Sequence, residues 1–295
     1  MAADASHPEP DPLIPASIEL GGVMVIAVDD AHGSFMNFRA AFPGAPDELE
    51  QDGWLRYPEL FAGAAWTLPF RSYLVRSSDR RLLIDAGVGP PPGQFLPKRQ
   101  GRLPAELARL GCQREQIDIV FLTHLHVDHI GWAAINGAPF FPNARYLTSG
   151  DDWRFFAARA ESRAVFADKL APLERAGVVE LVEAHDVELA PGVAAVATPG
   201  HTPGHMSVLV RSPRRQLCIL GDVAVHPLQV KEPDLVYAYD EDGDKATASR
   251  RRLLGEIAAG DAVVAAGHFP TRGGFGRVVA VDERHDRFAW QPLDR

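Results

Sequence analysis

The chain has 295 residues, of which 46% are hydrophobic and 23% are charged. This composition is typical of a globular protein and excludes a largely disordered, collagen-like or low-complexity chain. Lysine and arginine number 30 against 39 aspartate and glutamate residues, which gives a formal net charge of −9. A general nucleic-acid-binding protein needs cations that neutralise phosphates, so this charge balance predicts no nucleic-acid partner.

The N-terminal segment is predicted to form a disordered arm. Residues 1–17 contain four prolines and lack the basic and apolar regions of a secretory signal. No apolar stretch reaches the roughly 18 residues that a membrane-spanning helix needs, which predicts no membrane partner. Two cysteines are too few for a disulfide framework. We therefore expect a cytoplasmic protein with one domain over residues 18–295.

The rest of the chain is dominated by short apolar runs between turns. In order, we expect a strand at 22–28, an irregular surface excursion over 29–65, a hairpin over 72–87 and a loop over 90–101. Next come a helix over 103–111, strands at 117–123 and 144–149, and a helical stretch over 152–176. Four strand-like runs follow at 178–183, 193–198, 206–211 and 216–222. A helix over 244–259, a strand over 261–269 and a hairpin over 277–290 complete a pattern that predicts a single domain of mixed class.

A dense cluster of histidines follows the strand at 117–123. His124, His126 and His129 fall within six residues, together with Asp128. Imidazole nitrogens and carboxylate oxygens are the ligands that suit Zn²⁺ and other borderline divalent ions. A lone histidine after a strand is usually a capping or surface residue, but three histidines and an aspartate in one tight loop indicate a metal site.

Three further candidate ligands lie in turns after later strands: His201 in ATPGHTPGH, Asp222 in LCILGD and His268 in VVAAGHF. The complete set then has five imidazoles and two carboxylates. This number is too large for one tetrahedral ion, whereas two ions that share a bridging carboxylate accommodate it. The sequence therefore predicts a dinuclear metal site.

The segments HLHVDH, TPGHTPGH, GD and AGH, in this order, resemble the motif series of the metallo-β-lactamase-fold hydrolases. The resemblance extends from about residue 22 to about residue 281. It implies an α+β fold of the four-layer αββα sandwich type, in which loops after the strands hold the metals at one edge. It also implies two divalent ions as cofactors, with zinc foremost and manganese, cobalt or iron as alternatives. A homodimer is a further expectation from the family.

The resemblance assigns a role to each candidate ligand. The first ion would be held by His124, His126 and His201, the second by Asp128, His129 and His268, and Asp222 would bridge them. Two more residues would support the ligands: Asp85 in LLIDAG and His205, the second histidine of TPGHTPGH. Carboxylates in such supporting positions fix the orientation of the ligating imidazoles.

The implied chemistry is hydrolysis. A water held between two divalent ions loses a proton near neutral pH and becomes a nucleophile, and one ion polarises the carbonyl or phosphoryl oxygen of the substrate. Asp128 and Asp222 would be catalytic through the ions they hold. No GxSxG motif suggests a serine nucleophile. We therefore predict a small-molecule substrate, namely a neutral or apolar ester, lactone or phosphotriester.

Several alternatives stay open. They are a quorum-quenching acyl-homoserine lactonase, a glyoxalase II-like thioesterase, a mononuclear iron oxidoreductase on the same fold, and a binding protein without catalysis. The last fits poorly, because every ligand position is filled.

One position bears on the lactonase alternative. Such lactonases place a tyrosine three residues after the bridging aspartate, where Val225 stands here. We expect activated aryl esters or phosphotriesters to react faster than acyl-homoserine lactones, because a phenolate leaves without protonation. The adjacent His226 is a candidate replacement acid, with a loop histidine as the alternative.

Five aromatic residues near the ligand loops are candidates for the pocket wall: Trp132, Trp153, Phe155, Phe156 and Phe269. A wall of this kind would suit a hydrophobic or aryl substrate, but aromatic side chains are also common in cores. Two other patterns carry structural expectations. The run Arg250 to Arg252 predicts the exposed face of a helix. Asp151 and Asp152, with Ser149 three residues before Asp152, are expected to cap the helix that follows them, and substrate contacts are the alternative.

Overall fold

The computed structural model describes residues 16–90, 101–183, 186–282 and 287–293. The predicted N-terminal arm lies outside the described residues except for residues 16 and 17, and so does most of the predicted loop over 90–101. The first strand, β1, begins at Ser17, which pairs with Ile26. Strand β1 thus begins one residue before the domain boundary expected from the sequence.

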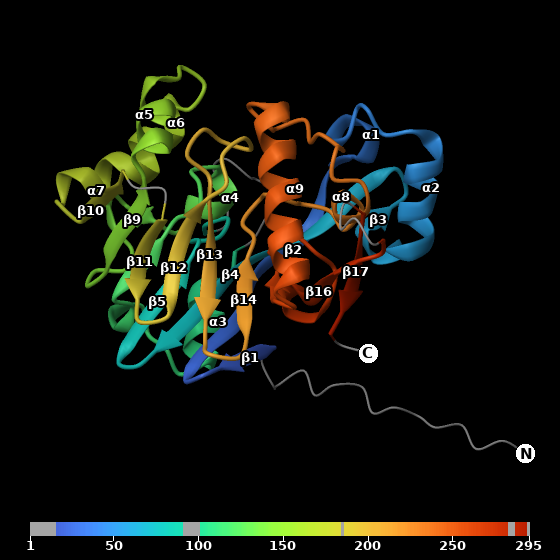
Figure 1. Cartoon of the computed structure of the whole chain (residues 1–295). Coiled ribbons are helices and arrows are strands. Elements are labelled where there is room, and N and C mark those ends of the chain that lie inside the picture. Colours follow the sequence, from blue (N-terminus) through green and yellow to red (C-terminus); the bar gives the residue numbers. More distant parts are fainter. Residues whose placement is uncertain (1–15, 91–100, 184–185, 283–286, 294–295) are drawn as a thin grey trace, which may run out of the picture.

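Two sheets form the body of the described part of the chain (Figure 1). The first sheet has the order β1-β2-β4-β5-β6-β9-β10, with β3 paired to β4. Its strands are β1 (Ser17–Leu20), β2 (Val23–Asn37), β3 (Phe61–Ala62), β4 (Ala65–Ser77), β5 (Arg80–Ile84), β6 (Ile119–Phe121), β9 (Arg145–Ser149) and β10 (Val179–Val182). Its strands from β5 to β10 pair in parallel, and the others pair antiparallel.

The second sheet follows the chain order from β11 to β17. Its strands are β11 (Asp186–Ala190), β12 (Val193–Ala197), β13 (Met206–Arg211), β14 (Gln216–Ile219), β15 (Val263–Ala265), β16 (Phe275–Ala280) and β17 (Phe288–Pro292). The pairing of β14 with β15 is parallel, because the chain crosses over through a helix between them. A small separate hairpin consists of β7 (Ala134–Ile135) and β8 (Ala138–Pro139).

The helices are mostly short. The α-helices are α1 (Phe38–Ala41), α2 (Asp47–Arg56), α3 (Leu103–Arg109), α4 (Val127–Ile130), α5 (Gly150–Ala158), α6 (Arg163–Val165), α7 (Ala171–Arg175), α8 (Leu228–Lys231) and α9 (Gly243–Ala259). Short segments of other helix types are η1 (Pro58–Leu60), η2 (Arg114–Gln116), η3 (Phe166–Leu170) and η4 (Arg272–Gly274). Among the described residues, every helix is too short or too polar to cross a membrane.

Side-chain alternation along β2 explains the layers. Val25 and Ala27 belong to the core between the two sheets, whereas Ile26 and Val28 belong to the core on the outer face of the first sheet. Successive side chains of a strand point to opposite faces, so a strand that is apolar at every position is buried on both sides. A second layer is therefore required on each face of the first sheet.

Helices provide these outer layers. Leu103 and Leu107 of α3 pack on the outer face of the first sheet, and Leu253, Leu254 and Ile257 of α9 pack on that of the second. The spacing of these leucines and isoleucine is that of one helix face. The order helix, sheet, sheet, helix confirms the predicted α+β class and αββα sandwich.

The expectation for residues 29–65 was wrong. Strand β2 continues to Asn37 and pairs with β4 along its length, and α1, α2, η1 and β3 follow. Register shifts between Asp29 and Ala31 and between Ser34 and Asn37 interrupt the alternation of the strand. Such bulges hide the period of two on which strand prediction depends. This segment closes a fourth apolar cluster, which includes Phe38, Phe42 and Trp66.

The arginine run on α9 was also only partly predicted. Arg251 and Arg252 are exposed, but Arg250 is completely buried. Arg250 lies three, four and seven residues before the buried residues Leu253, Leu254 and Ile257, so it shares their face of the helix. Its guanidinium donates to the carbonyl oxygens of Val223 (2.6 Å), Pro233 (2.7 Å) and Leu235 (3.0 Å). Arg250 therefore ties α9 to the segment between β14 and α9.

We predict that Arg250→Ala lowers the free energy of unfolding by about 3–5 kcal/mol, because it leaves buried acceptors without their donor. Arg251→Ala removes an exposed ion pair with Asp234 and should cost at most about 0.5 kcal/mol. Urea unfolding of the two variants measures the difference. Equal losses in both variants would contradict the role assigned to Arg250.

Candidate metal centre

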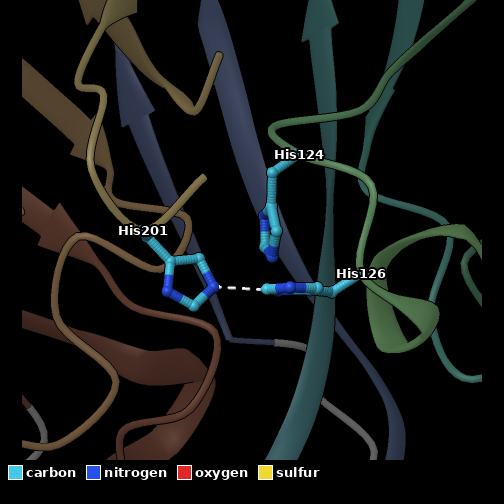
Figure 2. Close-up of side chains that lie close together, drawn as sticks. All are labelled: His124, His126 and His201. Carbon is cyan, nitrogen blue, oxygen red and sulfur yellow. Dashed lines mark hydrogen bonds between the residues drawn. The ribbon is translucent and has the colours of Figure 1, made fainter. Parts of the chain in front are cut away.

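The predicted ligands all lie in segments that follow strands, at one edge of the sandwich. His124 and His126 lie in the loop after β6, and α4 carries Asp128 and His129. The others come from the second sheet, after β12, β14 and β15 respectively: His201, Asp222 and His268. Figure 2 shows the rings of His124, His126 and His201 directed toward one another. The facing Nδ1 of His126 and Nε2 of His201 are 3.0 Å apart.

The ligating atoms form three overlapping groups within 4.8 Å. These groups are His124, His126 and His201; His124, His129 and Asp222; and Asp128, His129 and His268. The structure thus brings together all seven residues named from the sequence. Each group contains three imidazole or carboxylate ligands. Three protein ligands are the usual number in a catalytic zinc site.

Asp222 lies between the groups. Its Oδ2 atom is 3.4 Å from Nε2 of His201 and 3.8 Å from Nε2 of His124. Its Oδ1 atom is 3.3 Å from Nε2 of His268 and 3.4 Å from Nε2 of His129. One carboxylate oxygen therefore faces one pair of histidines and the other oxygen faces the second pair. This arrangement is what a carboxylate shared by two ions requires.

Electrostatics favour cations at this place. Burial and the neighbouring His129 hold the pKa of His124 well below its usual value, so this imidazole is neutral at neutral pH. Burial opposes ionisation of Asp222, but the charges of His129 and His268 outweigh it and hold the pKa of this carboxyl well below its usual range. Burial opposes protonation of His129 and His268, but the carboxylate of Asp222 raises the pKa of both. Metal ligands are deprotonated, so binding of ions here would release protons from these two rings.

Buried atoms without partners provide an independent test of the metal fit. Nε2 of His124, Nε2 of His129 and Oδ1 of Asp222 are buried and make no hydrogen bond within the described part of the chain. Each such atom costs about 1–3 kcal/mol if it stays unsatisfied. All three point into the ligand cluster, and divalent ions bound there would satisfy them. The residues present therefore fit the two ions that the motifs imply.

The two predicted supporting residues contact the cluster. Oδ2 of Asp85 bonds Nδ1 of His129 at 2.9 Å, and Oδ1 accepts from the backbone N–H of Thr123 at 2.8 Å. His205 accepts the backbone N–H of Asp222 through Nε2 at 2.9 Å, so its Nδ1 carries the proton and donates to Thr198 at 2.8 Å. Burial lowers the pKa of His205 to about 3. It stays neutral and fixes the backbone of Asp222.

Three other groups orient the ligands and were not found from the sequence. Nδ1 of His268 donates to the carbonyl oxygen of Pro69 at 2.8 Å, which directs Nε2 into the site. Nδ1 of His201 bonds Oδ1 of Asp240 at 3.0 Å. The other oxygen of Asp240 accepts from Arg250 at 3.3 Å. Asp240 stands in a run of acidic residues that has no distinguishing period, so no pattern in the sequence identified it.

The third group is Asp152, which does not cap the helix, although Ser149 of the predicted capping pattern does. The helix N-cap is Ser149, which accepts from the backbone N–H of Asp151 at 3.2 Å. Asp152 is completely buried and accepts from Thr202 (2.7 Å) and from the backbone N–H of Gly204 (2.6 Å). Burial raises the pKa of Asp152 to about 6. Through its bonds with Thr202 and Gly204, Asp152 fixes the loop that carries His201.

A cavity of about 310 Å³ opens onto the cluster. His126, Asp128, His201, Asp222 and His268 form its floor. Its walls are largely aromatic and consist of Phe35, Trp66, Phe70, Phe156, Tyr237 and Tyr239, with aliphatic side chains between them. Apolar walls around a few convergent polar groups are characteristic of small-molecule sites.

Most of the aromatic residues proposed for this wall lie elsewhere. Phe156 lines the cavity, as expected. The other four have different neighbours: Trp132 donates to Asp30, Trp153 packs on Phe166, Phe155 contacts Arg159, and Phe269 packs on Trp290. Proximity in sequence to the ligand loops did not identify the wall, because most of it comes from the segments around β2, β4 and residue 237.

His226 does not line the cavity, although Val225 does. Its ring is completely buried among five aromatic side chains: Phe38, Phe42, Tyr57, Phe61 and Trp66. Its Nδ1 accepts the backbone N–H of Leu228 at 3.1 Å. Burial lowers the pKa of His226 to about 3, so the ring is neutral at neutral pH and cannot act as an imidazolium acid. The structure therefore agrees with the alternative in which His226 is a loop histidine, and it places that histidine in the interior.

Comparison with known proteins agrees with this geometry. Residues 71–268 match the profile of the Metallo-beta-lactamase superfamily. The chain belongs to this superfamily. An N-acyl homoserine lactonase of Bacillus cereus is 27% identical over 224 residues, which are 71% of this chain and 84% of that protein. The resemblance inferred from the motifs, and with it the metallohydrolase class, is confirmed.

Two solved structures share the fold over nearly the whole chain. The hydrolase AbOPH of the beta lactamase superfamily has a TM-score of 0.82 and 23% identity. The dizinc quorum-quenching lactonase AidC has a TM-score of 0.80 and 22% identity. Each comparison covers 95% of this chain and 98% of the other.

We predict two divalent ions per chain. Asp222→Asn should lower this number toward one, because the amide keeps the shape of the bridge but loses its charge. Asp240→Asn leaves all seven ligands in place and should weaken metal binding by about 10–100-fold. Elemental analysis and competition with a chelator measure both effects. An unchanged metal content in Asp222→Asn would contradict the bridging position.

A second prediction concerns His226. Its pKa in the folded state, about 3, lies below the unfolded value of about 6.5. The unfolded state therefore binds the proton first, and the stability that the neutral ring provides is lost as the pH falls from about 6.5 toward 3. His226→Phe should flatten this pH dependence by up to about 1.4 kcal/mol per pH unit. Urea unfolding between pH 7 and pH 4 measures it. A loss of lactone turnover without loss of stability would instead restore His226 as a catalytic acid.

Proposed function

We propose that this protein is a dinuclear zinc hydrolase that cleaves neutral lactones and esters with an apolar acyl group. The observation that carries the proposal is the aromatic cavity with the ligand cluster as its floor. The first ion would be held by His124, His126 and His201 and the second by Asp128, His129 and His268, with Asp222 between them. Bound ions would supply a Lewis acid and a water that ionises near neutral pH.

The ligand chemistry supports zinc. Five imidazoles and two carboxylates without a thiolate suit zinc, and also manganese or cobalt. The described cysteines, Cys112 and Cys218, are buried and lie outside the three ligand groups. A redox-active iron centre is the alternative from another reaction class, and metal analysis of the purified protein separates the two.

The protein's own residues orient the ligands and select the substrate. Asp85, Asp240 and the carbonyl group of Pro69 hold three ligand imidazoles in fixed orientations. Among the described residues that line the cavity, none is a lysine or an arginine, and Glu161 is the acidic residue of the wall. An anionic substrate would find no cation to pair with there, apart from the metals. This disfavours a glyoxalase II-like thioesterase, whose glutathione substrates are anionic.

The expected preference for aryl substrates stays a prediction. It rested on Val225, which cannot bond a substrate oxygen where such lactonases place a tyrosine. The cavity wall contains Tyr237 and Tyr239 from a different segment. The lactonases among the relatives also support a lactone substrate. An aryl phosphotriester stays a second candidate, because aromatic walls suit an aryl leaving group.

A substrate panel tests the proposal. We expect the zinc-loaded protein to hydrolyse N-acyl homoserine lactones and p-nitrophenyl esters. Each added methylene in the acyl chain should raise kcat/KM by about fourfold until the cavity is full, because its burial contributes about 0.8 kcal/mol. A glutathione thioester and an aryl phosphotriester complete the panel. Rates that are independent of acyl length, or highest with the anionic thioester, would contradict the proposed substrate class.

A further inference from the structure

Tyr237 lies deep in the cavity, beside the metal ligands. Its ring stacks on the ring of His201, with centroids 5.9 Å apart and an angle of 13° between the planes. The ring of Trp66 contacts it edge-on at 5.9 Å, and that of Phe42 packs at 5.5 Å. The side chain is almost fully buried, yet it lines the cavity. Its position is thus fixed by packing before any substrate enters.

The side chain of Tyr237 lines the same cavity as the ligands His201 and Asp222. A tyrosine hydroxyl group ionises only at about pH 10. The group therefore keeps its proton at neutral pH. Among the described residues, Tyr237 bonds Asp240 through its backbone N–H, and its hydroxyl group has no protein acceptor. A protonated donor in the cavity without such an acceptor is free to bond a substrate.

The backbone that carries Tyr237 is also held in place. Its N–H donates to Oδ2 of Asp240 at 3.0 Å, and the same carboxylate contacts the buried Arg250. Arg250 additionally bonds the carbonyl oxygen of Leu235 at 3.0 Å. Donors that stabilise a developing charge are effective when they need no reorganisation during the reaction. The network around Asp240 satisfies this condition for Tyr237.

The neighbouring Tyr239 differs in each respect. It is 46% exposed, and its ring contacts Phe35 (5.9 Å) and His126 (6.3 Å) near the mouth of the cavity. It therefore provides a matched control, because it is the same residue type in the same segment and the same cavity.

We propose that the Tyr237 hydroxyl donates a hydrogen bond to the acyl oxygen of the substrate, on which negative charge develops during hydrolysis. This inference rests on the proposed esterase and lactonase function. Water adds to the acyl carbon, a new C–O bond forms, and the electron pair of the carbonyl π bond moves onto the acyl oxygen. That oxygen accepts the hydrogen bond while Tyr237 keeps its proton. The carbonyl then re-forms, the bond to the leaving oxygen breaks, and the proton lost by the water is available to the departing alkoxide.

Tyr237→Phe tests this role in the zinc-loaded protein, with Tyr239→Phe as the control. Loss of one such donor lowers kcat by about 10²–10³-fold. We expect this loss for a p-nitrophenyl ester in Tyr237→Phe, with little change in KM. The matching thionoester should lose much less, because its sulfur accepts hydrogen bonds weakly. The ratio of oxoester to thionoester rates should therefore fall in Tyr237→Phe. Tyr239→Phe also alters the cavity wall, so any change in its rates should be equal for the two esters.

Two further measurements separate catalysis from structure. Metal content and melting temperature should match the wild type in Tyr237→Phe, because the ring and its stacking on His201 remain. Equal losses for both esters, a lower metal content, or the larger effect in Tyr239→Phe would each overturn the role of Tyr237. A wild-type protein that cleaves no acyl substrate would refute the proposed function itself. An active wild type with an equally active Tyr237→Phe refutes this inference alone.

Discussion

Five imidazoles crowd around one buried carboxylate at the edge of the sandwich, and the surrounding structure is organised to hold them there. Five imidazoles this close cannot all be charged together, and Nε2 of His124 and Nε2 of His129 have no hydrogen-bond partner among the described residues. Such a cluster costs folding free energy unless cations occupy it. The backbone of both sheets must therefore fix the ligands against their tendency to separate, with the help of Asp85, His205 and Asp240.

This constraint extends well beyond the ligands. His201 bonds Asp240, Asp240 bonds Arg250, and Arg250 anchors α9 to the segment that follows β14. Asp152 fixes the same histidine loop from the side of α5. Helices on both outer faces of the sandwich are thus connected to the site through buried charge-assisted hydrogen bonds, which are stronger than those between neutral groups.

The ligands could be found from the sequence because they are dense, chemically distinctive and placed at strand ends. The layers could be found because the apolar periods of β2, α3 and α9 are regular. Residues that act through three-dimensional proximity could not. Asp240 and Arg250 look like solvated charges in the chain, and the bulges of β2 conceal a strand behind irregular spacing. The cavity wall was missed for the same reason, since Phe35, Trp66 and Tyr237 are far from the ligand motifs in sequence.

The two sides of the cavity differ in how freely they can change. Neither Phe35 nor Trp66 forms a hydrogen bond with a metal ligand among the described residues. Substitutions at these two positions would therefore reshape the acyl site and leave the metals in place. On the other side, the backbone N–H of Tyr237 and Nδ1 of His201 both bond the carboxylate of Asp240. A substitution that moves this backbone would disturb a metal ligand as well. Divergence of substrate range in this protein is therefore expected to proceed from one wall, while the other stays nearly invariant.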